Sequence, residues 1–152
     1  MVNQNDQIEQ QLFKMLRRTQ AIHVRTASGD VELERSSYGI LCLLSDDGPQ
    51  RLGSIANAFR LDPSTITRQV QAVVRLGLAE KHVDERDRRA TVLSLTDQGA
   101  EAVAEARAHR RQMLDALLHE WTKAQRTEFL ASLTRFNETV DSWIEREDDA
   151  DS

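Results

Sequence analysis

The sequence predicts a mainly α-helical fold that carries one small β-hairpin. Three observations support this fold class. Apolar residues recur at spacings of three and four over most of the chain, as they do in amphipathic helices. Turn signals divide the helical stretches, most sharply at Asp62-Pro63 and at Gly77. A charged run at 84–89 separates two short apolar segments, and this arrangement indicates a hairpin.

Length and composition indicate one globular domain. The chain has 152 residues, of which 39% are hydrophobic and 30% are charged, so it can bury a core of its own. No segment approaches the roughly 18 uncharged apolar residues of a membrane helix, and the N-terminus lacks the apolar run of a signal peptide. Cys42 is the single cysteine and cannot form an intrachain disulfide. We therefore expect a cytoplasmic protein with no membrane association.

Three helices are predicted before residue 60. The first covers about 6–26, where apolar residues follow the helical period, and the glycine-containing segment 28–30 should end it. The second covers about 33–44 and stops at a dense turn signal at 45–49. The third is short and lies around 55–59.

Asp62-Pro63 marks the start of the next helix. An Asp at a helix cap can accept backbone N–H bonds, and Pro fits the first helical position because no N–H is needed there. The helix should run to about Leu76 and end at Gly77. Together with the short helix before it and the tight turn at 60–62, it predicts a helix-turn-helix.

A hairpin and two long helices complete the predicted order. Short strands are expected at 79–83 and 90–95, joined by a charged loop too long for a two-residue turn. The segment 96–97 should cap a helix that ends near Trp121. The segment 122–125 matches a capping box, which opens the last helix.

The helix that starts at Pro63 has two distinct faces when its residues are placed about 100° apart. Ile66, Val70 and Val73 share one face, which should pack on the domain. The opposite face carries hydroxyl, amide and guanidinium groups and no acid, so it can bind base edges and phosphates in a major groove. A solvated surface is the alternative for this face taken alone. The expected DNA contacts are Ser64, Thr65, Thr67, Arg68, Gln71 and Arg75.

The hairpin loop concentrates Arg86, Arg88 and Arg89. Arginine side chains bind narrow minor grooves, where the negative potential is enhanced. Asp87 should orient a neighbouring arginine rather than meet DNA. Taken alone, the loop could be a surface turn whose own acids neutralise its arginines. Because it follows a predicted helix-turn-helix, we interpret it as a DNA-binding wing.

The net charge of −5 does not exclude a DNA partner. From 60 to 89 the chain holds seven basic and five acidic residues, a balance of +2, whereas the rest holds 13 and 20, a balance of −7. Attraction to phosphate depends on the local field rather than on the total charge.

Five stretches carry a family resemblance. They are LGSIA at 52–56, LDPSTITR at 61–68, LGLAEK at 76–81, DRRA at 87–90 and LSLTDQG at 93–99. Over about 33–99 the chain resembles the MarR family of winged helix-turn-helix transcriptional regulators, and the Asp-Arg-Arg followed by Leu-Thr-x-x-Gly is specific in this context. Glu34 and Ser37 depart from the family pattern, in the second helix.

The resemblance implies one MarR-like domain over 1–152, with a winged helix-turn-helix lobe at 33–99, helical dimerisation segments at 1–32 and 100–147, and an acidic tail at 148–152. It implies a homodimer on a palindromic operator, usually a repressor that a small aromatic or lipophilic effector releases. Apolar side chains of the last two helices support a dimer independently. They are Met113, Leu114, Leu117, Leu118, Trp121, Phe129, Leu133, Phe136, Val140 and Trp143.

Three alternatives differ in function. An enzyme is disfavoured because the four histidines are scattered and no Ser/His/Asp order or Gly-rich phosphate loop occurs, so we expect no catalytic site, metal or cofactor. A metal- or redox-responsive regulator of the same fold would need more ligands or a reactive thiol, and Cys42 among leucines is interpreted as a core thiol. A winged-helix interaction module without DNA binding would not need Arg68 or the loop arginines Arg86, Arg88 and Arg89. His23 and Tyr38 are candidates for an effector pocket, and either could equally be a packing residue.

Overall fold

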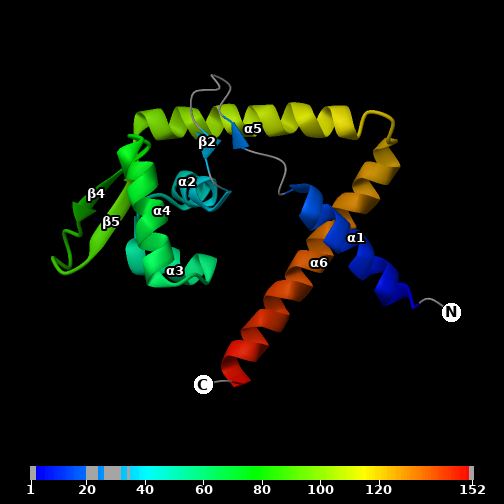
Figure 1. The fold of residues 1–152 in the computed structure, drawn as a ribbon, viewed down its shortest axis with the longest axis horizontal. Coiled ribbons are helices and arrows are strands. Elements are labelled where there is room, and N and C mark those ends of the chain that lie inside the picture. The colour runs from blue at the N-terminus through cyan, green and yellow to red at the C-terminus, as the bar shows by residue number, and fades with distance from the viewer. Residues whose placement is uncertain (1–2, 20–23, 26–31, 34, 151–152) are drawn as a thin grey trace. The chain divides into compact units, whose positions relative to one another are not determined.

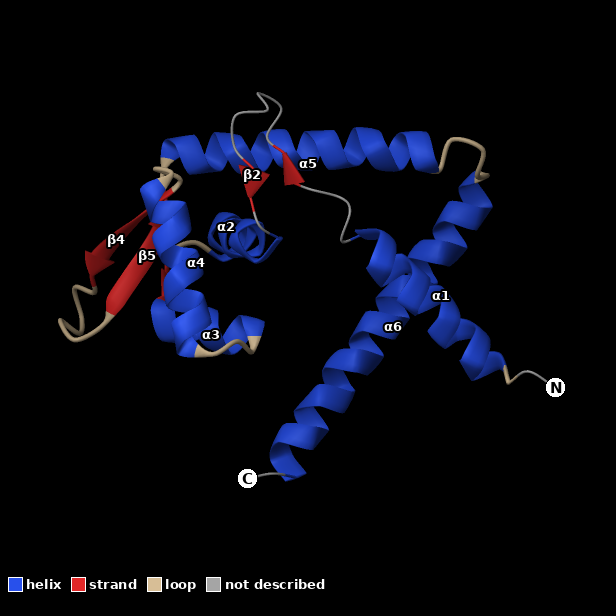
Figure 2. Ribbon diagram, in the orientation of Figure 1, coloured by secondary structure: helices blue, strands red, loops and turns tan. Residues whose placement is uncertain are grey.

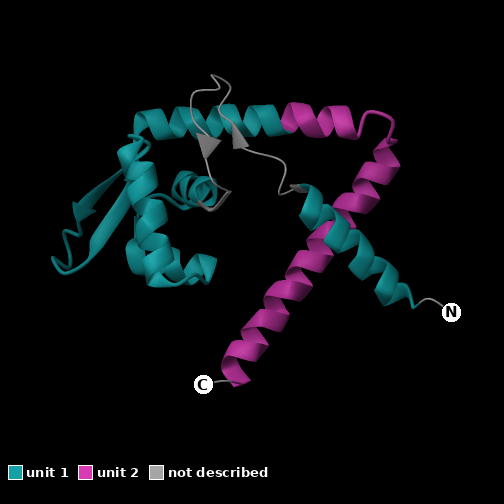
Figure 3. Cartoon of the chain, viewed as in Figure 1, with its two compact units in different colours: residues 1–110 teal, residues 111–152 magenta. Residues whose placement is uncertain are grey.

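The computed structural model describes residues 3–19, 24–25, 32–33 and 35–150. The chain divides into two compact units, Met1–Arg110 and Arg111–Ser152, and we describe each by itself (Figure 3). None of the described helices combines the length and apolar character needed to cross a membrane.

The first unit contains the predicted mainly helical order with its hairpin (Figures 1 and 2). Its elements are α1 (Gln4–Thr19), β1 (Val24–Arg25), β2 (Glu32–Leu33), α2 (Arg35–Asp47), β3 (Gln50–Arg51), α3 (Leu52–Phe59), α4 (Pro63–Arg75), β4 (Ala79–Val83), β5 (Thr91–Leu95) and the first part of α5 (Asp97–Leu117). The three two-residue strands β1, β2 and β3 were not predicted, because two residues are too few to show a period.

The predicted hairpin is the larger part of a three-stranded antiparallel sheet with the order β3-β5-β4. β4 and β5 pair from Ala79 opposite Leu95 to Val83 opposite Thr91. β3 lies on the other side of β5, where Arg51 is opposite Val92. The added strand places the residues just before α3 beside the hairpin.

The first helix is shorter than predicted. α1 ends at Thr19 rather than near Thr26, and its last turn holds two basic residues, which complement the negative end of the helix dipole. The predicted helix is wrong at Val24, which lies in β1 and pairs with β2, in keeping with the extended preference of β-branched residues. The predicted break at 28–30 and the effector candidate His23 lie outside the described residues.

One apolar core occupies the first unit. It is formed by side chains of α2, α3, α4, β4, β5 and α5 together with Leu78, the residue before β4. The predicted inward face of α4 is confirmed, because Ile66, Val70 and Val73 are all buried. The largest fully buried side chains are Ile40, Leu41, Ile55, Leu78, Leu93, Val70, Val73 and Val103.

α4 ends at Arg75, and Gly77 terminates it two residues later, as predicted. Gly77 has a φ of 73°, a left-handed conformation that glycine adopts without steric cost. Its N–H donates to the carbonyl of Val74 at 3.0 Å, and the N–H of Leu78 donates to the carbonyl of Val73 at 3.0 Å. These two bonds form a Schellman motif, which satisfies carbonyls at the helix end.

Thr96 ties the end of α4 to the start of α5. Its Oγ1 donates to the carbonyl of Gly77 at 2.7 Å and accepts the N–H of Gly99 at 3.0 Å, so one hydroxyl contacts both helix ends. The predicted cap of α5 is confirmed at this residue. A Cβ on Gly99 would lie 1.9 Å from the carbonyl oxygen of Leu78, so only glycine lets the first turn of α5 approach this backbone.

The second unit contains the end of α5 and the helix α6 (Lys123–Ala150). α5 ends at Leu117, a few residues before the predicted end. The predicted capping box is confirmed: the N–H of Thr122 donates to Gln125 Oε1 at 2.9 Å, and the N–H of Gln125 donates to Thr122 Oγ1 at 3.2 Å. α6 continues to Ala150 and includes the beginning of the acidic stretch.

Candidate nucleic-acid interface

α3, a tight turn and α4 form the helix-turn-helix. At the turn, Arg60 adopts a left-handed φ of 50°, and among the described residues it is the non-glycine with a positive φ. Leu61 N–H donates to the carbonyl of Ala56 at 3.3 Å and closes the turn. Asp62 occupies the cap position of α4, but its side chain makes no capping hydrogen bond, so the predicted carboxylate cap is wrong. Pro63 at the first helical position is confirmed, and its fixed φ accounts for the helix start.

The polar face of α4 is open to solvent. Thr65 is half-buried, whereas the five side chains of the predicted stripe are exposed. Thr67 Oγ1 donates to the carbonyl of Pro63 at 2.8 Å, so its hydroxyl retains only acceptor capacity. No acidic residue lies in the first turn of α4. The exposed members of the stripe are Ser64, Thr67, Arg68, Gln71 and Arg75.

Gln69 is a buried polar residue of α4 that the sequence reasoning did not single out. Its side chain is 6% exposed, and its Oε1 has no hydrogen-bond partner in the part of the chain that the structure describes. The sequence signal for its burial is its position beside the apolar face of the helix. An unsatisfied buried acceptor costs about 1–3 kcal/mol, so Gln69 is a weak point of this core.

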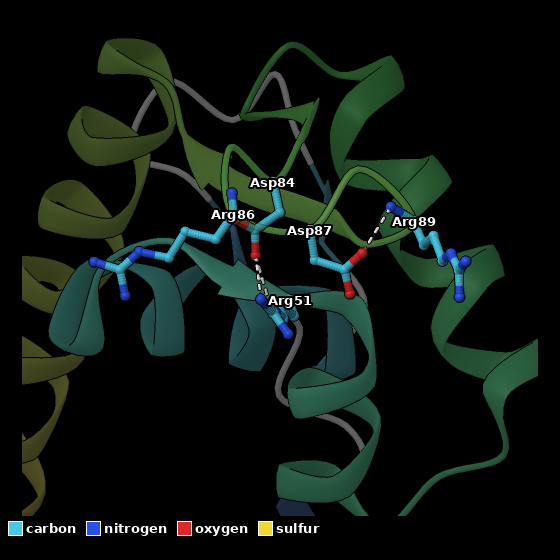
Figure 4. Close-up of polar contacts among 5 residues, drawn as sticks. All are labelled: Arg51, Asp84, Arg86, Asp87 and Arg89. Atoms are coloured by element: carbon cyan, nitrogen blue, oxygen red, sulfur yellow. Dashed lines mark hydrogen bonds and ion pairs between the residues drawn. The ribbon is translucent and has the colours of Figure 1, made fainter.

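Two acids hold the wing loop in shape. Asp84 Oδ1 accepts the N–H of Arg86 at 2.9 Å, and Asp84 Oδ2 accepts Nε of Arg51 at 2.7 Å (Figure 4). Asp87 Oδ1 accepts the N–H of Arg89 at 3.0 Å. The Arg86 N–H, and after it the Arg51 guanidinium, hold the pKa of the Asp84 carboxyl below its usual range. Both acids therefore stabilise the conformation of the loop.

The arginines of the wing keep their charged groups available. Within the described residues no ion pair joins the guanidinium of Arg86, Arg88 or Arg89 to an acid, and all three side chains are exposed. Figure 4 shows the guanidinium groups of Arg86 and Arg89 extending away from the two carboxylates. The alternative of a self-neutralised surface turn does not describe this loop.

Arg51 is the residue of this site that the sequence reasoning missed. It lies on β3, 33 residues before its partner Asp84. A two-residue strand has no periodic signal, and the ion pair depends on the tertiary pairing of β3 with β5. Nothing in the local sequence around Arg51 predicts this contact.

Tyr38, the effector candidate that the structure describes, is a core residue of α2. Its side chain is 4% exposed, and Cζ of Arg110 lies 4.1 Å from the centre of its ring. Burial, and then a hydrogen bond with Cys42, raise the pKa of the Tyr38 phenol. Cys42 is half-buried against the core rather than fully buried. Nearby, Arg107 pairs with Asp46 at 2.8 Å.

Comparison with known proteins supports the fold and the family. The model of the MarR family matches residues 33–91, which run from the last residue of β2 to the first residue of β5. YxaD, an uncharacterized HTH-type transcriptional regulator of Bacillus subtilis (strain 168), is 31% identical over 140 residues, covering 90% of this chain and 96% of the relative.

Solved structures show the same fold. The crystal structure of RV1404 from Mycobacterium tuberculosis is similar with a TM-score of 0.75 at 25% identity, covering 93% of this chain and 97% of that one. The crystal structure of MarR has the same fold, with a TM-score of 0.65 at 22% identity over 72% of this chain and 80% of that one. The chain belongs to the MarR family of winged helix-turn-helix transcriptional regulators.

Proposed function

We propose that the protein is a sequence-specific DNA-binding regulator in which α4 enters the major groove and the wing contacts a neighbouring minor groove. One observation carries the proposal: the acids of the wing loop bind backbone N–H groups and Arg51, whereas Arg86, Arg88 and Arg89 are exposed and their guanidinium groups pair with no acid among the described residues. Guanidinium groups in this state are suited to the negative potential of a minor groove.

On α4 we assign different roles to residues of different chemistry. Arg68 and Gln71 have side chains that can make paired hydrogen bonds to guanine and adenine edges. Arg75, in the last turn, is suited to a phosphate. The hydroxyl residues Ser64, Thr65 and Thr67 can bind either bases or phosphates.

We propose that the functional form is a homodimer joined through 1–32 and 100–147. α6 is described over its whole length, and none of its residues is buried. Its exposed apolar side chains include Phe129 at 43% and Leu130 at 66%. Soluble monomers rarely expose so continuous an apolar surface, so a second copy should cover it. Two-fold symmetry in the protein would then match a palindromic operator.

We further propose repression as the mode of regulation and release by a small aromatic or lipophilic effector. Occupation of an operator blocks transcription when it overlaps a promoter. Among proteins of this fold, PcaV from Streptomyces coelicolor was solved in complex with its natural ligand, with a TM-score of 0.57 and 23% identity to this chain. That complex supports a search for a ligand of this chain.

The test is binding to two duplexes of about 30 base pairs, one of random sequence and one selected by the protein from a random pool. Affinity for both should fall steeply as salt rises from about 50 to 200 mM, because phosphate contacts release counterions. Arg68→Ala should cost about 1–3 kcal/mol on the selected duplex and less on the random one. Arg75→Ala should weaken both equally.

Two results would contradict the proposal. Absence of salt-dependent binding to either duplex would exclude DNA as the partner. An equal loss on both duplexes for Arg68→Ala would reduce Arg68 to a phosphate contact.

A further inference from the structure

We infer that the Arg51–Asp84 pair positions the wing for DNA, an inference that rests on the proposed function. Asp84 is the first residue after β4, and its carboxylate has two partners. Oδ1 accepts the N–H of Arg86, while Oδ2 lies 2.6 Å from the NH2 group of Arg51 on β3. One carboxylate therefore connects the strand before α3, the end of β4 and the start of the arginine loop (Figure 4).

The surroundings of the pair suit a positioning role. β3 runs directly into α3, the first helix of the helix-turn-helix, and α3 packs against α4. Arg51 is therefore directly followed in the chain by the helix that supports α4. The Asp84 side chain is 14% exposed, whereas that of Arg51 is 49% exposed. Because water has limited access to the carboxylate, the charge-assisted bonds are stronger than those of a fully solvated pair. The pair thus orients the loop relative to the helix-turn-helix.

Simple electrostatics gives the opposite prediction for this acid. A carboxylate near DNA repels phosphates, so its removal should strengthen binding when charge alone matters. Removal of a carboxylate that holds the loop should weaken binding instead. Glu85 provides the matched control, because it is the adjacent acid, is exposed, and makes no hydrogen bond or ion pair in the described part of the chain.

The experiment compares Asp84→Asn, Arg51→Gln, Arg51→Lys and Glu85→Gln on the selected duplex by fluorescence anisotropy. Asn keeps an acceptor for the Arg86 N–H but loses the ion pair. We expect Asp84→Asn and Arg51→Gln to bind about tenfold more weakly, Arg51→Lys to recover most of the loss, and Glu85→Gln to bind more tightly than the wild type. The double variant of Asp84→Asn with Arg86→Ala should lose less than the two separate losses combined.

Two measurements on the protein without DNA test whether the effect of Asp84→Asn is local to the wing loop. The Arg86 amide should exchange faster with solvent in Asp84→Asn, while the melting temperature changes by less than about 3 °C. A large fall in melting temperature would overturn a local role.

The DNA results distinguish the two proposals. If the wild type binds DNA and Asp84→Asn tightens binding as Glu85→Gln does, the positioning role is wrong and the proposed function stands. If the wild type binds neither duplex, the proposed function fails and the positioning role fails with it.

Discussion

The two units of the chain, coloured separately in Figure 3, differ sharply in the exposure of their apolar side chains. In the first unit, Ile40, Leu41 and Ile55 are 0% exposed. In the second, Leu130 of α6 is 66% exposed and no residue of that helix is buried. The first unit carries a core of its own, whereas the apolar face of α6 in the second unit is exposed.

The period of the apolar residues is helical in both α4 and α6, so periodicity does not explain the difference. A helix buries its apolar face only when neighbouring elements cover it. α2, α3 and β4 contact α4 from several sides. Periodicity therefore predicts a helix and its apolar face, whereas burial depends on the elements around it.

Self-association of the proposed homodimer should change most. Leu133→Glu combined with Phe136→Glu places two charges on the exposed apolar face of α6, so association of the proposed homodimer should weaken at least about 1000-fold, or about 4 kcal/mol. Analytical ultracentrifugation measures this. Ala131→Glu with Thr134→Glu adds the same charge on another side of α6 and should leave the dimer intact. A dimer of normal affinity in the first variant would contradict the proposed role of the exposed apolar face of α6.

The next effect separates a buried leucine from an exposed one. Leu93→Ala in β5 should lower the free energy of unfolding by roughly 3 kcal/mol, because a 0% exposed side chain leaves a cavity. Leu130→Ala should change it by less than about 0.5 kcal/mol. Both are measured by urea unfolding in the monomeric Leu133→Glu, Phe136→Glu background. Equal losses would show that α6 is packed within the monomer.

A glycine pair tests how closely the backbone packs in the first unit. Gly99→Ala should cost about 2–3 kcal/mol, since its Cβ would meet the Leu78 carbonyl oxygen at 1.9 Å. Gly53→Ala in α3 meets no heavy atom within 4 Å and should be neutral or stabilising, because alanine favours helix. Thermal unfolding distinguishes the two. An unperturbed Gly99→Ala would mean that α5 can shift away from Leu78 without loss.

The smallest expected change in the free energy of unfolding is at Gln69, the weak point in the core. Gln69→Leu should raise the free energy of unfolding by about 1 kcal/mol, because it removes a buried acceptor that has no partner among the described residues. Gln71→Leu, on the exposed face of the same helix, should give no such gain. Destabilisation by Gln69→Leu would show that the amide group stabilises the core.

Features with local chemistry were predicted well. Pro63, Gly77 and Thr96 each mark a helix end through their own backbone or side-chain chemistry, and the structure confirms all three. The exposed stripe of α4 followed from spacing alone. Asp62 is the exception, because its residue type is suited to a capping bond that the structure does not contain.

Features that depend on distant partners were not predictable from the sequence. The ion pair between Arg51 and Asp84 joins residues 33 positions apart, and it forms only because β3 pairs with β5. Gln69 Oε1 has no hydrogen-bond partner in the described part of the chain because of the core that surrounds it. In both cases tertiary packing, rather than the residues adjacent in sequence, determines which groups lie next to each other.

The hydrogen bonds of Thr96 have a consequence for how the molecule opens. Its N–H donates to the carbonyl of Leu78 at 3.1 Å, beyond the last pair of the hairpin, and its hydroxyl bonds to Gly77 and Gly99. The hairpin base cannot separate without exposing the end of α4 and the first turn of α5 to solvent. Amides at these three places should therefore share one opening free energy in hydrogen exchange, as a single cooperative unit.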